Sequence, residues 1–170
     1  AELARRLEPR TSPPERRLAA IRALAEAGIP TGVMAAPMIP GLNDHELPSI
    51  LGAAFEAGAR FAGLTLIRLP LGVSSLFEEW LDRHEPGRKE KVLSRIRSIR
   101  GGRLNDSRFG SRMRGEGPFA DMIHGIFRKT CRRLGLNRSS WPVSASAFRV
   151  PDDNPMSVDS QGPRQLRLFD

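Results

Sequence analysis

The sequence predicts an α/β protein in which helices alternate with parallel strands. Two apolar segments, 31–39 and 61–69, each follow an amphipathic helix, and the tripeptide Glu-Ala-Gly closes both helices, at 26–28 and again at 56–58. Neither apolar segment alternates cleanly with polar residues, which is typical of strands covered on both faces in a parallel sheet. Because right-handed crossovers set consecutive strands of such units side by side, we expect the two strands to pair.

The first amphipathic helix is expected to begin after Ser12. Serine is a favoured N-cap, the proline that follows costs no hydrogen bond in the first turn, and Glu15 lies where it completes a capping box. Gly28 should end the helix because glycine adopts the left-handed conformation cheaply, and Pro30 prevents its continuation. The strand 31–39 follows.

A second helix is expected after Asn43, which can cap it together with Glu46, and Gly58 should end it. The strand 61–69 comes next, and no further strand is predicted beyond Pro70. Apolar residues at helical spacing then predict three helices, around 76–81, around 92–99 and from 118 to 134.

The chain is expected to divide into a partial α/β unit (1–72), a helical, arginine-rich extension (73–136) and a linker with a tail (137–170). Residues 137–164 are rich in Ser, Pro and Asp, which favours disorder. Two parallel strands cannot form a stable sheet alone, since both edges leave backbone groups unpaired. We therefore expect this chain to be a fragment, with the missing strands before Ala1 or in another chain.

Composition restricts the chemistry. A single cysteine, Cys131, excludes an internal disulfide framework and a self-contained cysteine-held metal cluster, and it favours a reducing, cytoplasmic compartment. His45, His84 and His124 share no metal-ligand spacing. No membrane span or signal peptide is visible. The net charge of +8 suits phosphate-rich partners, although arginine-rich surfaces are equally common in proteins from GC-rich genomes.

The segment 35–44, Ala-Ala-Pro-Met-Ile-Pro-Gly-Leu-Asn-Asp, is the strongest site candidate, because an apolar strand ends there in a polar loop. Ligands bind at this edge in α/β barrels and open sheets. Gly41 allows a ligand to approach the backbone closely. The alternative is an ordinary turn and helix cap, in which Asn43 satisfies backbone amides and does nothing more.

Several motifs together carry a family resemblance. They are Leu-Glu-Pro-Arg-Thr-Ser at 7–12, Arg-Leu at 17–18, Ala-Gly-Ile-Pro at 27–30 and Ala-Pro-Met-Ile-Pro-Gly-Leu-Asn-Asp at 36–44, followed by Arg-Gly-Gly-Arg at 100–103, Asp-Ser-Arg-Phe-Gly at 106–110 and Arg-Met-Arg-Gly-Glu-Gly-Pro at 112–118. Residues 1–136 thereby resemble the second half of a radical S-adenosylmethionine protein. The likeness is strongest to an uncharacterised bacterial group related to spore photoproduct lyase.

The resemblance implies a partial (βα)6 barrel that binds a four-iron four-sulfur cluster and cleaves S-adenosylmethionine reductively to a 5′-deoxyadenosyl radical. In that family the loop after the fifth strand often reads Gly-x-Ile-x-Gly-x-x-Glu, and its isoleucine packs on the adenine. This chain has Ile39, Gly41 and Asp44 at those steps, but Pro37 replaces the first glycine. Met38 or Ile39 is thus a candidate adenine contact, with ordinary core packing as the alternative.

Glu8, Arg10 and Thr11 lie before the preceding helix, where relatives hold the polar end of the nucleotide or the methionine. The planar guanidinium of Arg10 suits a carboxylate, and a solvated surface arginine is the competing interpretation. The predicted cofactor-binding residues are Glu8, Arg10, Thr11, Met38, Ile39, Gly41, Asn43 and Asp44.

One departure from the family is large. The cluster-binding Cys-x3-Cys-x2-Cys motif is absent, so this chain should bind no cluster and should be inactive alone. The cluster and S-adenosylmethionine are expected only in the full-length protein, together with the missing half of the barrel. Cys131 lies on an apolar helix face and is expected to be a buried structural residue.

Residues 95–114 contain seven arginines and one acid. We hypothesise that this connector contacts nucleic acid or closes over the barrel mouth, against the alternative of a solvated helix and loop. The candidate contacts are Arg103, Arg108, Arg112 and Arg114.

The final residues match a Gln-Leu-x-Leu-Phe pattern, which resembles the peptide by which bacterial repair and replication proteins dock into the polymerase sliding clamp. The alternative is a tail that folds back on its own domain. The candidate docking residues are Gln165, Leu166, Leu168 and Phe169. Two functions therefore remain open: part of a radical enzyme of the DNA-repair lyase type, or a non-catalytic interaction protein that binds DNA or the clamp.

Overall fold

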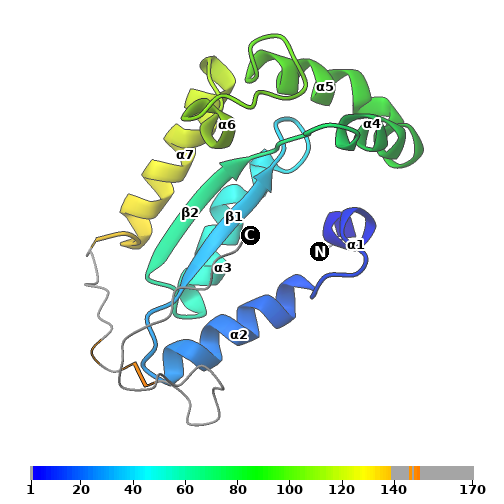
Figure 1. Cartoon of the computed structure of the whole chain (residues 1–170). Helices are drawn as coiled ribbons and strands as arrows, with labels where there is room; N and C mark the ends of the chain where they lie inside the picture. Colours follow the sequence, from blue (N-terminus) through cyan, green and yellow to red (C-terminus); the bar gives the residue numbers. More distant parts are fainter. Residues whose placement is uncertain (1, 139–145, 147, 150–170) are drawn as a thin grey trace, which may run out of the picture. The chain divides into compact units, whose positions relative to one another are not determined.

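The computed structural model describes residues 2–138, 146, 148 and 149, and the chain divides into units 1–139 and 140–170 (Figure 1). All of the elements below belong to the first unit. The helices are α1 (Glu2–Leu7), α2 (Pro14–Glu26), α3 (Leu47–Glu56), α4 (Val73–His84), α5 (Lys89–Ser98), α6 (Ser111–Arg114) and α7 (Pro118–Leu134), with 3₁₀ turns η1 (Asp44–Glu46) and η2 (Pro86–Arg88). The strands are β1 (Gly32–Met38) and β2 (Phe61–Leu66).

The two strands pair in parallel, with α3 as the crossover between them, which confirms the predicted α/β class. Gly32 pairs with Phe61 and Ala35 with Leu64, and the register shifts between Ala35 and Met38. The shift surrounds Pro37, which has no N–H to give to the ladder.

Several predicted boundaries are wrong. β2 ends at Leu66, and residues 67–69 leave the sheet as a linker toward α4. The N-cap of α2 is Pro13, and it makes no side-chain capping bond, so the capping box predicted from Ser12 and Glu15 does not form. The short helix α6 was not predicted, because it has no amphipathic repeat long enough to recognise.

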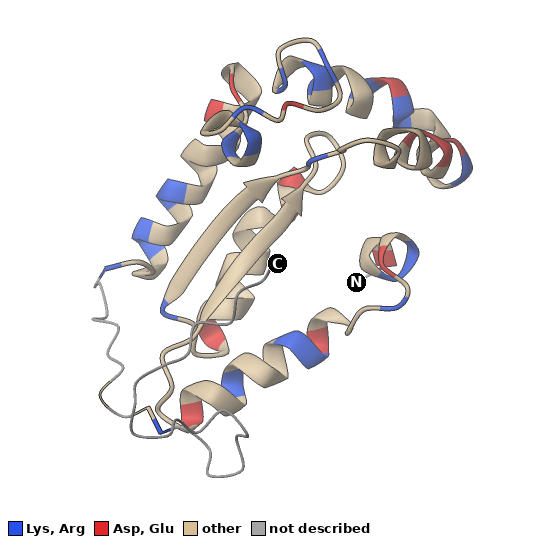
Figure 2. Ribbon diagram, viewed as in Figure 1, with Lys and Arg blue, Asp and Glu red and all other residues tan. Residues whose placement is uncertain are grey.

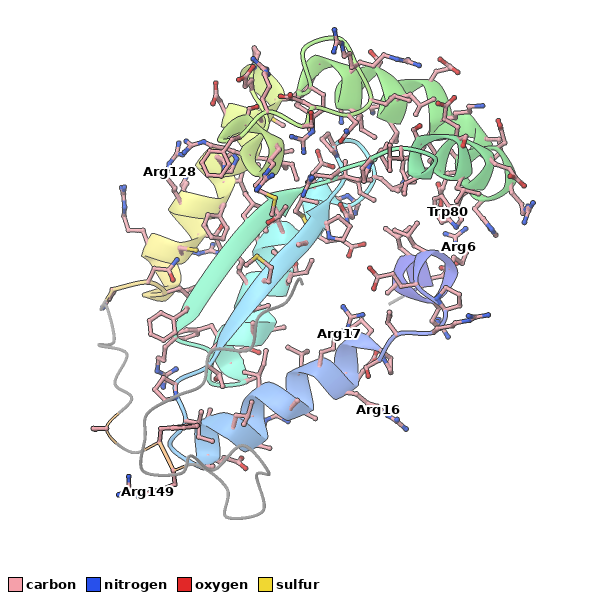
Figure 3. The ribbon with its side chains drawn as sticks, in the orientation of Figure 1. Arg6, Arg16, Arg17, Trp80, Arg128 and Arg149 are labelled. Carbon is pink, nitrogen blue, oxygen red and sulfur yellow. The ribbon has the colours of Figure 1, made fainter. Side chains whose placement is uncertain are left out.

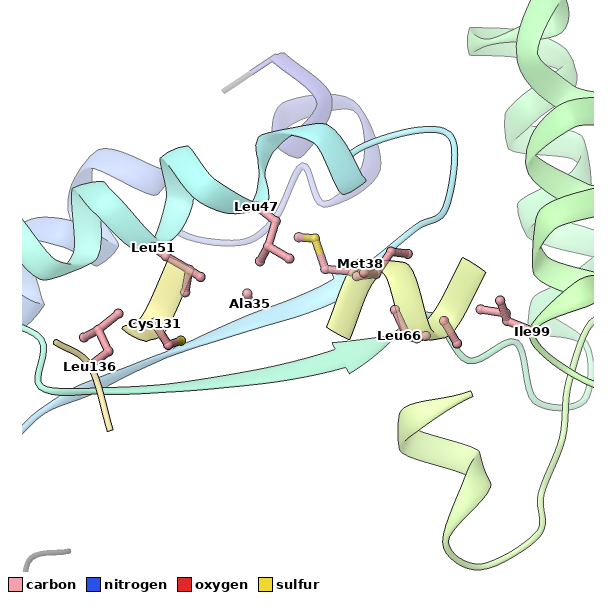
Figure 4. Packing of buried hydrophobic residues seen from close by; sticks show 10 residues of the cluster. Ala35, Met38, Leu47, Leu51, Leu66, Ile99, Cys131 and Leu136 are labelled. Carbon is pink, nitrogen blue, oxygen red and sulfur yellow. The ribbon is translucent and has the colours of Figure 1, made fainter. Parts of the chain in front are cut away.

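One face of the sheet carries the main core, because α3 and α7 both pack against it (Figures 1 and 4). Leu51 of α3 and Ile123 of α7 are fully buried, and each contributes about 2 kcal/mol by leaving water. Cys131 is buried in this layer, as predicted, and burial raises the pKa of its thiol. The core residues are Ala35, Met38, Leu47, Leu51, Leu66, Ile99, Ala120, Ile123, Cys131 and Leu136.

A second apolar cluster joins α4 and α5 to the loops that follow the strands. It contains Ile39, Leu42, Ile67, Leu69, Phe77, Leu81, Val92, Leu93 and Ile96. Helix α1 is held to α4 by polar contacts: Arg6 pairs with Glu85 at 3.0 Å, and the indole N–H of Trp80 donates to the carbonyl of Arg6 at 3.1 Å (Figure 3).

The other face of the sheet is open within the described residues, so the prediction of strands covered on both faces does not hold there. Gly32, Met34 and Ala36 are exposed on β1, and Met34 is 63% exposed. A Cβ at Gly63 would lie 2.6 Å from the methyl carbon of Met34, so a larger residue at 63 would require the flexible end of that side chain to move. No charged residue occurs on either strand, and Figure 2 shows both in tan.

Candidate functional site

The outer edge of β2, away from β1, is closed by Asn137 just beyond α7. Its side-chain amide accepts from the backbone N–H of Ala62 at 2.9 Å and donates to the carbonyl of the same residue at 3.0 Å. In a parallel strand the N–H and C=O of one residue point to the same side. Asn137 therefore takes the position of a neighbouring strand's peptide group and blocks pairing at that edge.

Arg100 closes the carboxyl end of β2. It is 2% exposed, and its guanidinium donates to the carbonyl oxygens of Leu66 (3.1 Å) and Ile67 (2.6 Å). It also donates to the carbonyls of Ser111 (3.1 Å) and Arg112 (2.8 Å), which fixes α6 against the strand end. Burial lowers the pKa of Arg100, while Asp106 acts in the opposite direction.

The free edge of β1 is different, because an apolar groove of about 490 Å³ runs along it. Helices α1, α2 and α3 form its other walls, and most lining side chains are aliphatic, among them Leu7, Leu18, Ile21 and Ile50. Three charged residues, Glu8, Arg17 and Glu46, lie at its lining as well. Within the residues that the structure describes, the sheet therefore has one edge occupied by Asn137 and one open edge beside a groove.

Glu8 and Thr11 are bound together by Arg17, which lies near the start of α2 (Figure 3). Arg17 Nη2 lies 2.9 Å from the Glu8 carboxylate and 2.8 Å from the Thr11 hydroxyl, and its Nε donates to the carbonyl of Ser12. Arg10 is exposed and has no carboxylate partner among the described residues. Glu8 and Thr11 would have to give up their contacts with Arg17 to bind a ligand. Among these three predicted residues, Arg10 has no such contact to lose.

The loop after β1 is stabilised by its own side chains. Asn43 accepts from the backbone N–H of Ile39 at 2.7 Å and donates to the carbonyl of Pro37 at 3.1 Å. Asp44 accepts from the N–H of Gly41 at 3.0 Å. Neither Asn43 nor Glu46 makes the side-chain N-cap bond that the sequence predicted for this helix. The polar side chains of this loop therefore satisfy backbone groups of the loop itself, as expected if the loop is an ordinary turn.

Gly41 has a steric reason to be glycine. Its φ is +84°, and a Cβ there would lie 3.1 Å from the side chain of Arg95. That arginine lies 3.9 Å from Asp44 and stacks over the ring of Phe119, with Cζ 5.0 Å from the centroid. The glycine lets Arg95 connect the loop to α7.

Met38 and Ile39 are both buried: Met38 lies in the core between the sheet and α3, and Ile39, at 0% exposed, lies in the second cluster. The structure brings Glu8, Met38 and Asn43 to the lining of the groove, while Ile39, Gly41 and Asp44 are absent from it. The assignment of all eight residues as cofactor contacts stays a prediction.

In the described part of the chain, no group of three or more His, Cys, Asp or Glu side chains is arranged to hold a metal ion. Along those same residues, no helix combines the length and apolar character needed to cross a bilayer.

The arginine-rich connector, residues 95–114, contains both paired and unpaired guanidinium groups; Figure 2 shows Lys and Arg in blue along the ribbon. Arg108 is paired with Asp106 at 3.0 Å and with Glu116 at 3.0 Å. The bonds from Arg108 and Ser111 hold the pKa of Asp106 well below its usual range. Among the described residues, Arg103, Arg112 and Arg114 have no carboxylate within 4 Å, so they remain stronger candidates than Arg108.

Sequence reasoning missed two residues that shape this region, Arg100 and Asn137. An arginine or asparagine in a polar connector has no pattern that marks it as a backbone ligand. The predicted docking residues Gln165, Leu166, Leu168 and Phe169 lie outside the described residues.

Comparisons with known proteins place the chain beside longer, uncharacterised relatives. No family model matches it, and no solved structure does. Uncharacterised proteins of Mycobacterium tuberculosis H37Rv and Mycobacterium bovis are each 38% identical to it over 102 residues. The match covers 58% of this chain but 28% of each relative, so the chain spans less than a third of the length of the relatives that it matches.

Proposed function

We propose that this chain supplies two βα units of a radical S-adenosylmethionine barrel whose remaining strands join along β1. The observation that carries the proposal is the asymmetry of the sheet. Asn137 and Arg100 close the outer edge of β2, whereas β1 has an open edge beside an apolar groove. In a barrel that is only partly closed, the last strand pairs with a neighbour along one edge and has no strand along the other, as β2 does within the described residues.

The groove suits a parallel strand that precedes α1. Helix α2 and β1 both line the groove, and both contribute aliphatic side chains to it. The N–H and C=O groups of every second residue of β1 point toward this edge and are available to a ladder. A strand that feeds α2 and then β1 would complete a right-handed βαβ crossover, which is the strongly preferred hand.

The open face of the sheet would then line the inside of the barrel. Two small exposed residues there, Gly32 and Ala36, leave room for part of a nucleotide beside the Met34 side chain, which lies over Gly63. The residues present fit such a wall, but they do not fit an iron–sulfur cluster, because Cys131 is buried against the opposite face. When bound, S-adenosylmethionine with the cluster supplies a radical that removes a hydrogen atom from a substrate. The chain's own residues form the wall and the carboxyl-edge loops.

To test the proposal, the reading frame is extended upstream of Ala1, and the longer protein is expressed in the cytoplasm and assayed for cleavage of S-adenosylmethionine. We expect an in-frame Cys-x3-Cys-x2-Cys motif, and 5′-deoxyadenosine formed from S-adenosylmethionine in the presence of dithionite. Cysteine-to-alanine changes in that motif should abolish the product, and the 170-residue chain alone should form none. An upstream frame without the motif would contradict the proposal, as would cleavage by the isolated chain.

A second candidate function is a non-catalytic interaction protein that binds nucleic acid, and the unpaired arginines of the connector favour it. Charge reversal at Arg103 and Arg112 should then reduce retention on a DNA column. Unchanged retention would count against this function. Clamp binding by the tail is a separate proposal: a clamp pull-down unaffected by Leu168→Ala and Phe169→Ala would rule it out.

A further inference from the structure

We propose that Phe109, with the arginines beside it, is a stacking site for a base of single-stranded nucleic acid. Phe109 is 91% exposed, which is unusual for an aromatic side chain with no polar atom. Among the described residues, its one ring partner is Arg112, whose Cζ lies 5.2 Å from the ring centroid. One face of the ring is therefore covered by a cation, and the other is available to a planar group.

The loop that carries Phe109 is held in place before any ligand binds. Asp106 accepts hydrogen bonds from the backbone N–H of Arg108 at 3.0 Å and from the hydroxyl of Ser111 at 2.6 Å. The Arg108 side chain then joins Asp106 to Glu116. Because these bonds close the loop on both sides of Phe109, little ordering entropy is lost when a base stacks on the ring.

The site is anchored at the carboxyl end of β2. Arg100 holds the backbone of Ser111 and Arg112 to the end of the strand. Arg68, two residues past β2, donates to the thioether of Met113 at 3.5 Å, and its Nε is buried without a partner. A thioether is a weak acceptor, so the Arg68 guanidinium has most of its hydrogen-bonding capacity left for an anion.

Charge and aromatic surface together indicate the ligand class. Among the described residues, no carboxylate lies within 4 Å of the guanidinium groups of Arg68, Arg103, Arg112 and Arg114. Proteins that bind single strands combine a basic surface for phosphates with aromatic rings on which bases stack. An anionic membrane would also attract the arginines, but an inserting surface needs more apolar side chains than Phe109 and Met113 provide.

The inference rests on the nucleic-acid contact of the second candidate function and needs no radical chemistry. It is tested with the full 170-residue chain and a fluorescein-labelled oligothymidylate of about 12 nucleotides, a length within the usual range of single-strand sites. Fluorescence anisotropy measures the affinity. We expect Phe109→Ala to weaken binding roughly 5- to 150-fold, which corresponds to the usual loss of about 1–3 kcal/mol for one base-stacking ring, and Phe109→Trp to retain it.

Matched controls separate stacking from charge and from folding. Leu76→Ala removes another exposed apolar side chain, 65% exposed on α4, and should leave the affinity unchanged. Arg112→Gln should weaken binding, whereas Arg128→Gln on the exposed face of α7 (Figure 3) should weaken it less. Polyphosphate has no bases, so Phe109→Ala should not change its binding. Circular dichroism verifies that each variant keeps the helical content of the original chain.

Three results would overturn the inference. The first is no oligothymidylate binding at low salt, which also removes the second candidate function. The second is binding that the arginine changes weaken but Phe109→Ala does not; this supports nucleic-acid contact without the stacking site. The third is Phe109-dependent binding to phosphatidylserine vesicles without oligothymidylate binding. Formation of 5′-deoxyadenosine by the extended protein tests the first candidate function independently.

Discussion

Arg100 donates a 2.6 Å hydrogen bond to the carbonyl oxygen of Ile67, where the chain leaves β2. The pair connects the turn after α5 to the end of the sheet through a buried guanidinium. The Arg100 guanidinium also donates to the carbonyl oxygens of Leu66, Ser111 and Arg112. It therefore supplies the hydrogen bonds that water would supply to these carbonyls at an exposed site.

Arg100→Ala should therefore destabilise the fold by about 3 kcal/mol, since it leaves buried carbonyl oxygens without donors. Arg100→Lys should recover only part of the loss, because an ammonium group cannot reach four acceptors in a planar fork. Urea unfolding followed by circular dichroism measures both. Arg97→Ala, on an exposed position of α5, is the control and should change stability by less than about 0.5 kcal/mol. Equal effects at the two positions would show that the carbonyl contacts do not matter.

The repeated Glu-Ala-Gly closures offer an internal comparison. Gly28 and Gly58 both have positive φ, but a Cβ at Gly28 meets no atom within 4 Å, whereas one at Gly58 would lie 2.5 Å from Ala25 Cβ. We expect Gly28→Ala to cost about 1 kcal/mol of stability from backbone strain alone. Gly58→Ala should cost about 3 kcal/mol, because overpacking against α2 is added.

A double-mutant cycle checks the cause of that difference. Combining Gly58→Ala with Ala25→Gly removes the clash, so thermal or urea unfolding should give a favourable coupling energy of about 1 kcal/mol or more. Additive effects would mean that α2 moves freely away from Gly58 and that the contact carries no energy.

Asn43 should matter more for stability than its position in a polar loop suggests. Asn43→Ala leaves the N–H of Ile39 and the carbonyl of Pro37 without their partner, at a cost of about 2 kcal/mol. Asn43→Asp keeps the acceptor and loses the donor, so its cost should be smaller. Urea unfolding is the measurement, with His45→Ala, an exposed neighbour, as control. A neutral Asn43→Ala would remove the structural role assigned to this loop.

The ionisation of Asp106 should make the stability of the fold depend on pH. The pKa of its carboxyl is lowered below the ordinary 3.8 in the folded chain, so folding favours the charged form. Its contribution to stability is thus complete above about pH 4 and is lost as the pH falls toward the folded pKa. Asp106→Asn should lower the melting temperature at neutral pH, and its difference from the original chain should shrink below about pH 4. A difference that does not change with pH would show that ionisation of Asp106 is irrelevant.

Parts of this fold were predictable because they depend on local rules. The Glu-Ala-Gly closures and the apolar segments between them indicated both βα units, and the spacing of Ile123 and Cys131 indicated the buried face of α7. Tertiary contacts decided the rest. Asn43 was expected to cap a helix, but bonds to Ile39 and Pro37 take its side chain, and long-range contacts of Arg100 and Asn137 leave no mark in sequence.

The amide of Asn137 gives the sheet a direction of growth. Because Asn137 already occupies the outer edge of β2 at Ala62, any further strand is expected to pair beside β1. The same property predicts how the chain behaves when expressed by itself: self-association should proceed through β1, and soluble expression should improve when that edge, not the edge of β2, is blocked by proline or lysine.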